Sequence, residues 1–135
     1  MRGLKKICLL LASALLGTGV SAQNNAYGID DECFALFLRA EAIAGVVPDE
    51  EFNLINDSLL HTALAMNDKK AQVLYYVERL KHIIASSPKG DDSRIRKAFE
   101  ELKTISLSYG YRQYFYYAYE LVQNYFLTTK GAARL

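Results

Sequence analysis

Apolar side chains recur at steps of three and four residues through most of the chain. In one clear stretch they fall at Phe52, Ile55, Leu59, Ala63 and Met66, the spacing that places side chains on one face of an α-helix. Strict alternation of apolar and polar residues, typical of a half-buried strand, describes no stretch better than this helical period does. The pattern therefore predicts an all-α protein.

Residues that favour helix ends divide this pattern into five segments. Acidic residues that can accept from free backbone N–H groups open the first, third and fourth, at Asp30 or Asp31, at Asp68 and at 91–93. Pro48 opens the second, and Gly110 suits the left-handed residue that ends the fourth. We expect about five antiparallel helices, at residues 30–44, 49–66, 69–86, 92–108 and 111–128.

The second and third expected helices match the fourth and fifth when the sequence is shifted by 42 residues. Identical residues then coincide at four places: Leu60 with Leu102, Thr62 with Thr104, Tyr75 with Tyr117, and Glu78 with Glu120. A period of about 34 to 47 residues, with two antiparallel helices in each unit, is typical of an α-solenoid. We therefore expect a short α-solenoid, with a plain helical bundle as the alternative.

Residues 1–22 have the pattern of a cleavable signal peptide. Arg2, Lys5 and Lys6 precede an apolar run at 7–20, and the segment ends at Ala22. The run is shorter than the about 20 residues of a membrane-spanning helix. We expect cleavage between Ala22 and Gln23, a helical domain at 23–135, a periplasmic or secreted location, and no membrane span after cleavage.

Charge changes this picture little. The chain has 16 basic and 15 acidic side chains, and removal of the three basic residues in 1–22 leaves 13 against 15, a net charge near −2. A chain so balanced has no broad basic field, so nucleic acid is not an expected partner. Cys33 is the single cysteine after residue 22, and its helical position predicts a buried small apolar side chain rather than a reactive thiol.

No constellation of residues predicts catalysis or a cofactor. His61 and His82 fall on different expected helices, and the pair Asp57 and His61 at helical spacing gives only two of the ligands that a metal needs. The acidic clusters each open a helix, where capping accounts for them. We therefore expect no enzyme, no metal site and no cofactor, and we expect solvated or hydrogen-bonded roles for both histidines.

The fifth expected helix is unusually rich in aromatic residues. The best candidates for a ligand or partner surface are five tyrosines: Tyr111, Tyr114, Tyr116, Tyr117 and Tyr119. On a helix the aromatic residues cannot share one face, so more than one side of this helix needs a neighbour. The tyrosines either fill the core between stacked repeats with their hydroxyls at the rim, or line a groove for a peptide or sugar.

Several short motifs carry a resemblance to a known family. They are 22–25 with Tyr27, Ile29, Asp30 and Asp31; Asp57-Ser58-Leu59-Leu60 with Ala63; Asn67-Asp68-Lys69-Lys70-Ala71-Gln72; Gly110-Tyr111, Gln113-Tyr114 and Tyr116-Tyr117-Ala118; and Asn124-Tyr125 with Leu127 and Thr128. Together they resemble the periplasmic, tetratricopeptide-like N-terminal region of Bacteroides-type two-component sensor histidine kinases. The resemblance covers nearly all of 23–135 and implies a sensor module that is followed by further repeats, a membrane span and a kinase.

The chain departs from this family because it stops at 130–135, which reads as the start of a further helix. We expect a truncated sensor or a short relative that acts alone, without kinase activity. The expected function is protein or peptide binding on a surface drawn from the second and fourth helices, near Asn56, Leu60, Thr62, Glu101 and Thr104. Self-association through the fifth helix is a further expectation. The alternative function is small-molecule or glycan binding by the tyrosines of that helix.

Overall fold

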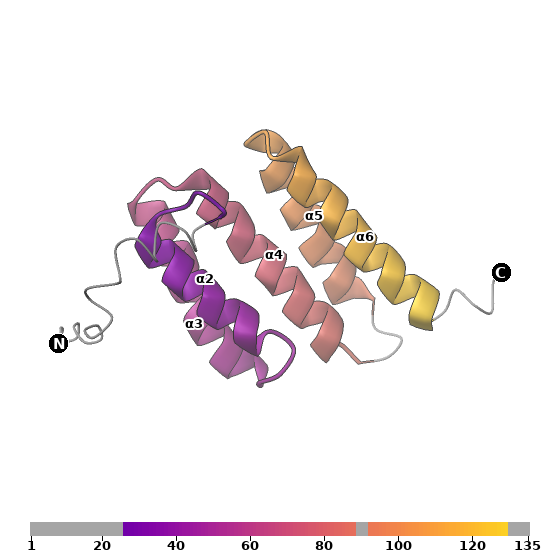
Figure 1. Ribbon diagram of the computed structural model, residues 1–135. Coiled ribbons are helices and arrows are strands. Elements are labelled where there is room, and N and C mark those ends of the chain that lie inside the picture. The colour runs from indigo at the N-terminus through magenta and orange to yellow at the C-terminus, as the bar shows by residue number, and fades with distance from the viewer. Residues whose placement is uncertain (1–25, 89–91, 130–135) are drawn as a thin grey trace.

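The computed structural model describes residues 26–88 and 92–129, so the expected signal peptide and residues 130–135 lie outside the described residues. It confirms an all-α protein of five helices that pack in sequence against antiparallel neighbours, with no strand in the described ranges. The helices are α2 (Asp31–Ile43), α3 (Asp49–Ala65), α4 (Lys69–Ser86), α5 (Ser93–Ser108) and α6 (Arg112–Thr129). Figure 1 shows α4 between the α2–α3 pair and the α5–α6 pair.

Two helix starts use the acidic caps that sequence patterning favours, whereas Asp92, before α5, makes no capping hydrogen bond with its side chain. Asp30 Oδ1 accepts from the N–H of Glu32 at 2.8 Å and caps α2. Asp68 Oδ1 accepts from the N–H of Ala71 at 3.0 Å and caps α4, while its Oδ2 accepts from the N–H of Asp30 at 2.7 Å. One carboxylate therefore fixes the start of α4 and ties the start of α2 to it.

Helix α4 joins two apolar clusters into one core. Its Ala71 and Leu74 pack in a cluster with α2 and α3, and its Val73 and Val77 pack in a second cluster with α5 and α6. Cys33 is fully buried in the first cluster, and burial, followed by the nearby Asp68 charge, raises the pKa of its thiol to about 11. This confirms the expectation of a small apolar role, because the thiol stays protonated at neutral pH.

The hairpin α3–α4 repeats as α5–α6 with an offset of 43 residues. Helix α4 begins at Lys69 and ends at Ser86, and α6 begins at Arg112 and ends at Thr129, each 43 positions later. Core positions of α3 and α5 follow the same offset, so that Phe52 corresponds to Ile95 and Leu59 to Leu102, all four of them buried.

The turns between the helices follow this offset as well. Asn67 and Gly110 both have a positive φ, of 53° and 82°. The N–H after each bonds back to the preceding helix, from Asp68 to the Ala63 carbonyl at 2.8 Å and from Tyr111 to the Ser106 carbonyl at 2.7 Å. This is the hydrogen bond that closes a helix at a left-handed residue, so the repeat extends to the backbone of the junction.

The expected offset of 42 is therefore wrong by one residue. Under an offset of 42, the buried Phe52 and Leu59 would correspond to Arg94 and Glu101, whose side chains have exposed fractions of 41% and 36%. One residue rotates a helix position by about 100°, so a slip of one exchanges a buried face for an exposed one. Offset 43 also gives four identities: Asp49 with Asp92, Leu59 with Leu102, Leu64 with Leu107, and Tyr76 with Tyr119.

Candidate functional site: hollows on two faces of helix α4

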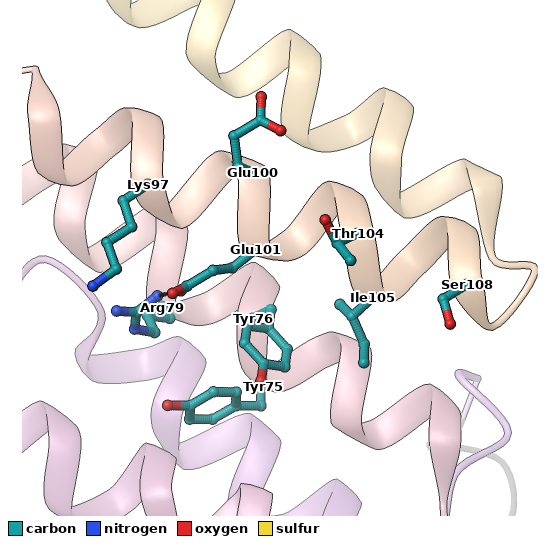
Figure 2. A pocket seen from close by; sticks show the side chains of 9 residues that line it. All are labelled: Tyr75, Tyr76, Arg79, Lys97, Glu100, Glu101, Thr104, Ile105 and Ser108. Carbon is teal, nitrogen blue, oxygen red and sulfur yellow. Dashed lines mark hydrogen bonds and ion pairs between the residues drawn. The ribbon is translucent and has the colours of Figure 1, made fainter.

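Helix α4 presents side chains to two separate hollows. The first follows α4 between α3 and α5, and we therefore call it the α3–α5 groove. It has a volume of about 600 Å³. Its lining residues come from α4 and α5: Tyr75, Tyr76, Arg79, Lys97, Glu100, Glu101, Thr104, Ile105 and Ser108. Figure 2 shows these side chains, with Tyr75, Tyr76 and Arg79 coming from α4 and the others from α5.

Two tyrosines and an ion pair give the α3–α5 groove its chemistry. The rings of Tyr75 and Tyr76 meet nearly at right angles, at 86° and 4.8 Å between centroids. Burial, followed by the Asp57 charge, raises the pKa of Tyr75 to about 12, so its hydroxyl remains a donor at neutral pH. Arg79 pairs with Glu101 across the α4–α5 contact, so the groove offers aromatic surface together with charges of both signs.

The groove continues toward the start of α3 and α5. A further hollow of about 220 Å³ shares Arg79 and Lys97 with it and also includes Asp49, His82 and Arg94. Together the two hollows form an elongated surface along α4, between α3 and α5.

The surface expected from the second and fourth helices matches this groove in part. Glu101 and Thr104 line it. Asn56 is buried instead, and its amide donates to the Tyr75 carbonyl at 3.1 Å. Leu60 and Thr62 do not line the groove.

The second hollow, which we call the α2–α6 pocket, lies on the opposite side of α4 and has a volume of about 270 Å³. Helices α2, α4 and α6 all contribute to it, together with the segment before α2. Its lining residues are Tyr27, Phe37, Glu41, Leu74, Val77, Glu78, Lys81, Gln113, Tyr114 and Tyr117. It is therefore mostly apolar and aromatic, with three charged groups and one amide.

Glu78 is the buried charge of this pocket, with an exposed fraction of 1%. Lys81 Nζ lies 3.2 Å from each of its carboxylate oxygens and 3.8 Å from Oε2 of Glu41. Burial raises the pKa of Glu78 to about 7, with Lys81 opposing the rise and Glu41 adding to it. Burial is the largest single influence on the pKa of Lys81 and acts to lower it, but Glu78, Tyr117 and Glu41 together raise it.

The five candidate tyrosines of α6 do not form one surface. Tyr114 and Tyr117 line the α2–α6 pocket. Tyr111 is half-buried beside Tyr114, with the Lys70 ammonium 5.7 Å from its ring centroid. Tyr116 and Tyr119 are exposed and do not line this pocket. Tyr111 and Tyr114 pack against the core, as the first interpretation of the tyrosines predicts, and binding of a peptide or sugar by this helix stays a prediction.

Sequence reasoning singled out neither Glu78 nor His82 as a buried polar residue. One feature of the sequence could have predicted a buried Glu78: it lies within the apolar pattern of α4, directly after Val77, and Lys81 follows three positions later as a possible ion-pair partner. His82 is hydrogen-bonded, as expected: its Nδ1 accepts from the Gly45 N–H at 2.9 Å.

Comparisons of the chain with protein-family models, curated proteins and solved structures give no match. Among residues 26–88 and 92–129, no three His, Cys, Asp or Glu side chains are grouped so as to hold a metal ion. A search of the same ranges finds no helix with the length and apolar character needed to cross a membrane.

Proposed function

We propose that the chain is a periplasmic or secreted interaction module, a tetratricopeptide-like α-solenoid fragment that binds a protein or peptide and performs no catalysis itself. The observation that carries the proposal is the helical hairpin repeated at an offset of 43 residues, in the core positions of α3 and α5 and in the turn hydrogen bonds. Stacked helical hairpins form solenoids whose extended surfaces bind partners. The unit is longer than the about 34 residues of a tetratricopeptide repeat, because α3 to α6 each have 16 to 18 residues.

The α3–α5 groove is the binding surface that we propose. It is elongated, and its aromatic residues Tyr75 and Tyr76 lie beside the Arg79–Glu101 ion pair. Tyrosine offers large, rigid contact area with a polar tip, which suits protein recognition, and paired charges of both signs can bond the donors and acceptors of an extended backbone.

The resemblance to the sensor region of two-component histidine kinases supports a place at the input end of a signalling system. On this proposal, the module recognises its partner outside the cytoplasmic membrane. Kinase activity is not proposed for this chain.

A selection of peptides displayed on phage against the chain that begins at Gln23 tests the proposal, with affinities of selected peptides measured by calorimetry. Thr104→Trp fills the groove from an exposed position on α5, and we expect it to weaken binding at least tenfold. Gln123→Trp, at an exposed position of α6 outside the groove, is the matched control. Failure to select any peptide, or equal binding by both variants, would count against a peptide-binding groove.

The alternative function, small-molecule or glycan binding by the fifth helix, gains support from the α2–α6 pocket, to which α6 contributes Tyr114 and Tyr117. It needs only these two of the five candidate tyrosines. This alternative would be favoured if a sugar binds to the Thr104→Trp variant, in which the α3–α5 groove is filled, and if Tyr117→Ala abolishes that binding.

A further inference from the structure

The α2–α6 pocket contains more negative than positive charge. Glu41 contributes a carboxylate from α2, and Glu78 contributes one from α4. Lys81 is the one cation among its lining residues. It lies within 4 Å of both carboxylates. When both acids are ionised, the pocket therefore has a net charge of −1.

One acceptor in this pocket is buried without a hydrogen bond. Oε1 of Glu78 has no hydrogen-bond partner among the described residues, although Lys81 Nζ lies 3.2 Å away as an ion pair. Buried polar atoms in proteins are almost always hydrogen-bonded, and an exception calls for an explanation such as a missing partner. Glu78 lines the pocket, so its carboxylate, together with that of Glu41, sets the charge that a ligand in the pocket meets.

The walls around Glu78 suit an apolar stem that ends in a cation. Leu74 and Val77 lie one turn and one residue before it on α4, and both line the pocket. The aromatic rings of Tyr27, Tyr114 and Tyr117 complete the wall, and aromatic rings attract cations. At about 270 Å³ the pocket is slightly smaller than those that hold drug-sized ligands, so it suits one side chain.

We propose that the α2–α6 pocket binds an alkylammonium group on an apolar stem, as a lysine side chain of a peptide partner presents it, with Glu78 as the principal acceptor. This inference rests on the proposed function, because it names a side chain that the partner presents at a second contact, on the side of α4 opposite to the α3–α5 groove. The ammonium donates to Oε1 of Glu78, Glu41 adds attraction from the rim, and the stem packs on Leu74 and Val77.

Charge favours this ligand over a sugar or an anion. A hydroxyl would supply a hydrogen bond to Glu78 but no charge, and charge-assisted hydrogen bonds are roughly twice as strong as neutral ones. An anion could pair with Lys81, but it would meet the carboxylates of Glu78 and Glu41 within the same small space.

The proposal carries a pH dependence. Lys81 on α4 and Glu41 on α2 act on Glu78, and the other titratable groups that line the pocket are Tyr27, Tyr114 and Tyr117. Burial raises the pKa of Glu78 to about 7, so an ammonium ligand must compete with a proton below that pH. Affinity should rise about tenfold between pH 6 and pH 8 as Glu78 ionises.

The test uses amide NMR spectra of the chain that begins at Gln23, titrated with Nα-acetyl-L-lysine amide. We expect shifts at residues of the α2–α6 pocket and none with Nα-acetyl-L-norleucine amide, which has a similar stem without the ammonium. Glu78→Gln keeps the shape of the side chain and should weaken binding about tenfold and remove the pH dependence. Glu120→Gln, at an exposed position of α6, is the control and should bind as the parent does.

Two further measurements distinguish the outcomes. n-Butylamine separates a free amine from a peptide side chain: tighter binding of the lysine amide supports the peptide source, and tighter binding of n-butylamine overturns it. Equal binding of the norleucine compound, or shifts confined to the α3–α5 groove, would overturn the cation site. Phage-selected peptides that bind without needing a lysine would overturn this inference while leaving the proposed function intact. Binding of the lysine amide in the absence of any selected peptide would support the cation site and count against the proposed function.

Discussion

His82 Nε2 lies 2.8 Å from Oδ1 of Asp49 and joins helix α4 to the first residue of α3. Because Nδ1 of this histidine accepts from the Gly45 N–H, Nε2 carries the proton and donates to the carboxylate. This hydrogen bond is the main cause that holds the pKa of Asp49 below its usual value. At the offset of 43 residues, the Tyr125 hydroxyl donates to Oδ1 of Asp92 at 3.3 Å, so a phenol and an imidazole occupy equivalent positions.

We expect His82→Ala to lower the free energy of unfolding by about 2–4 kcal/mol. The ring stacks on Phe52 at 4.2 Å between centroids, and its removal also leaves the Gly45 N–H without this acceptor. Urea unfolding followed by circular dichroism measures the change. His61→Ala, at an exposed position of α3, is the control and should stay within about 0.5 kcal/mol of the parent. A loss below about 1 kcal/mol for His82→Ala would show that these contacts contribute little.

Gly45 and Gly110 form a matched pair for backbone strain, since their φ angles are +78° and +82°. A Cβ at Gly45 would lie 2.7 Å from the Cβ of Ala85, whereas one at Gly110 meets no atom within 4 Å. Gly110→Ala should therefore cost about 1 kcal/mol, from the left-handed conformation alone. Gly45→Ala should cost about 2–4 kcal/mol because a steric clash is added. Equal melting temperatures for the two variants would contradict the close approach at Gly45.

Glu78 makes stability fall as pH rises. The folded chain holds this proton more tightly than the unfolded chain does, because burial raises the pKa from 4.5 to about 7. Between these two values the free energy of unfolding decreases with pH, by at most about 1.4 kcal/mol per pH unit, and it levels off above the folded pKa. Glu78→Gln should remove this contribution, so its advantage over the parent should grow from pH 5 to pH 8, as urea unfolding would measure. Glu120→Gln should show no such growing advantage, and a constant difference between Glu78→Gln and parent would contradict the raised pKa.

Tyr114 and Tyr116 should respond very differently to truncation. Tyr114 is half-buried and packs against both apolar clusters, so Tyr114→Ala should cost about 2–4 kcal/mol. Tyr116 has an exposed fraction of 60%, so Tyr116→Ala should change stability by less than about 0.5 kcal/mol. Thermal unfolding of both variants measures the contrast. A comparable loss for Tyr116→Ala would indicate that its face is covered in solution, for instance by self-association.

Cys33 should resist alkylation in the folded chain. It is fully buried, and its thiol pKa is raised to about 11 mainly by burial, so little of the reactive thiolate is present at neutral pH. In the chain that begins at Gln23 it is the single cysteine, and iodoacetamide labelling followed by mass spectrometry reports on it alone. We expect slow labelling without denaturant and rapid labelling in concentrated urea. Rapid labelling of the folded chain would show that α2 opens readily from the core.

Much of the fold could be predicted from local chemistry. The helical period predicted an all-α chain of five helices, and Asp68 and Gly110 marked two helix junctions because capping and left-handed backbone depend on neighbouring residues only. The offset between hairpins could not be predicted, because offsets of 42 and 43 residues give similar numbers of identities. Only the observed burial of residues such as Leu59 and Leu102 selects the second.

The candidate sites were harder to predict because they depend on three helices at once. Tyr114 and Tyr117 were singled out for their aromatic character, but the same character did not distinguish them from the exposed Tyr116 and Tyr119. Glu78 resembles a solvated charge in sequence and becomes buried because α4 has helices on both sides. Glu41, which pairs with the same Lys81, lies on α2, and no local pattern brings Glu41 and Glu78 together.

The central position of α4 also has a consequence for how the chain opens. Nine residues of α4 are buried, whereas in α6 only Ala118 is. Helices that bury little surface separate at a lower free-energy cost than the rest of a domain. Backbone amide hydrogens of α6 should therefore exchange with solvent through partial opening from the C-terminal side. Those of α4 should exchange only when the whole domain unfolds. Opening of this kind would dismantle the α2–α6 pocket before the α3–α5 groove.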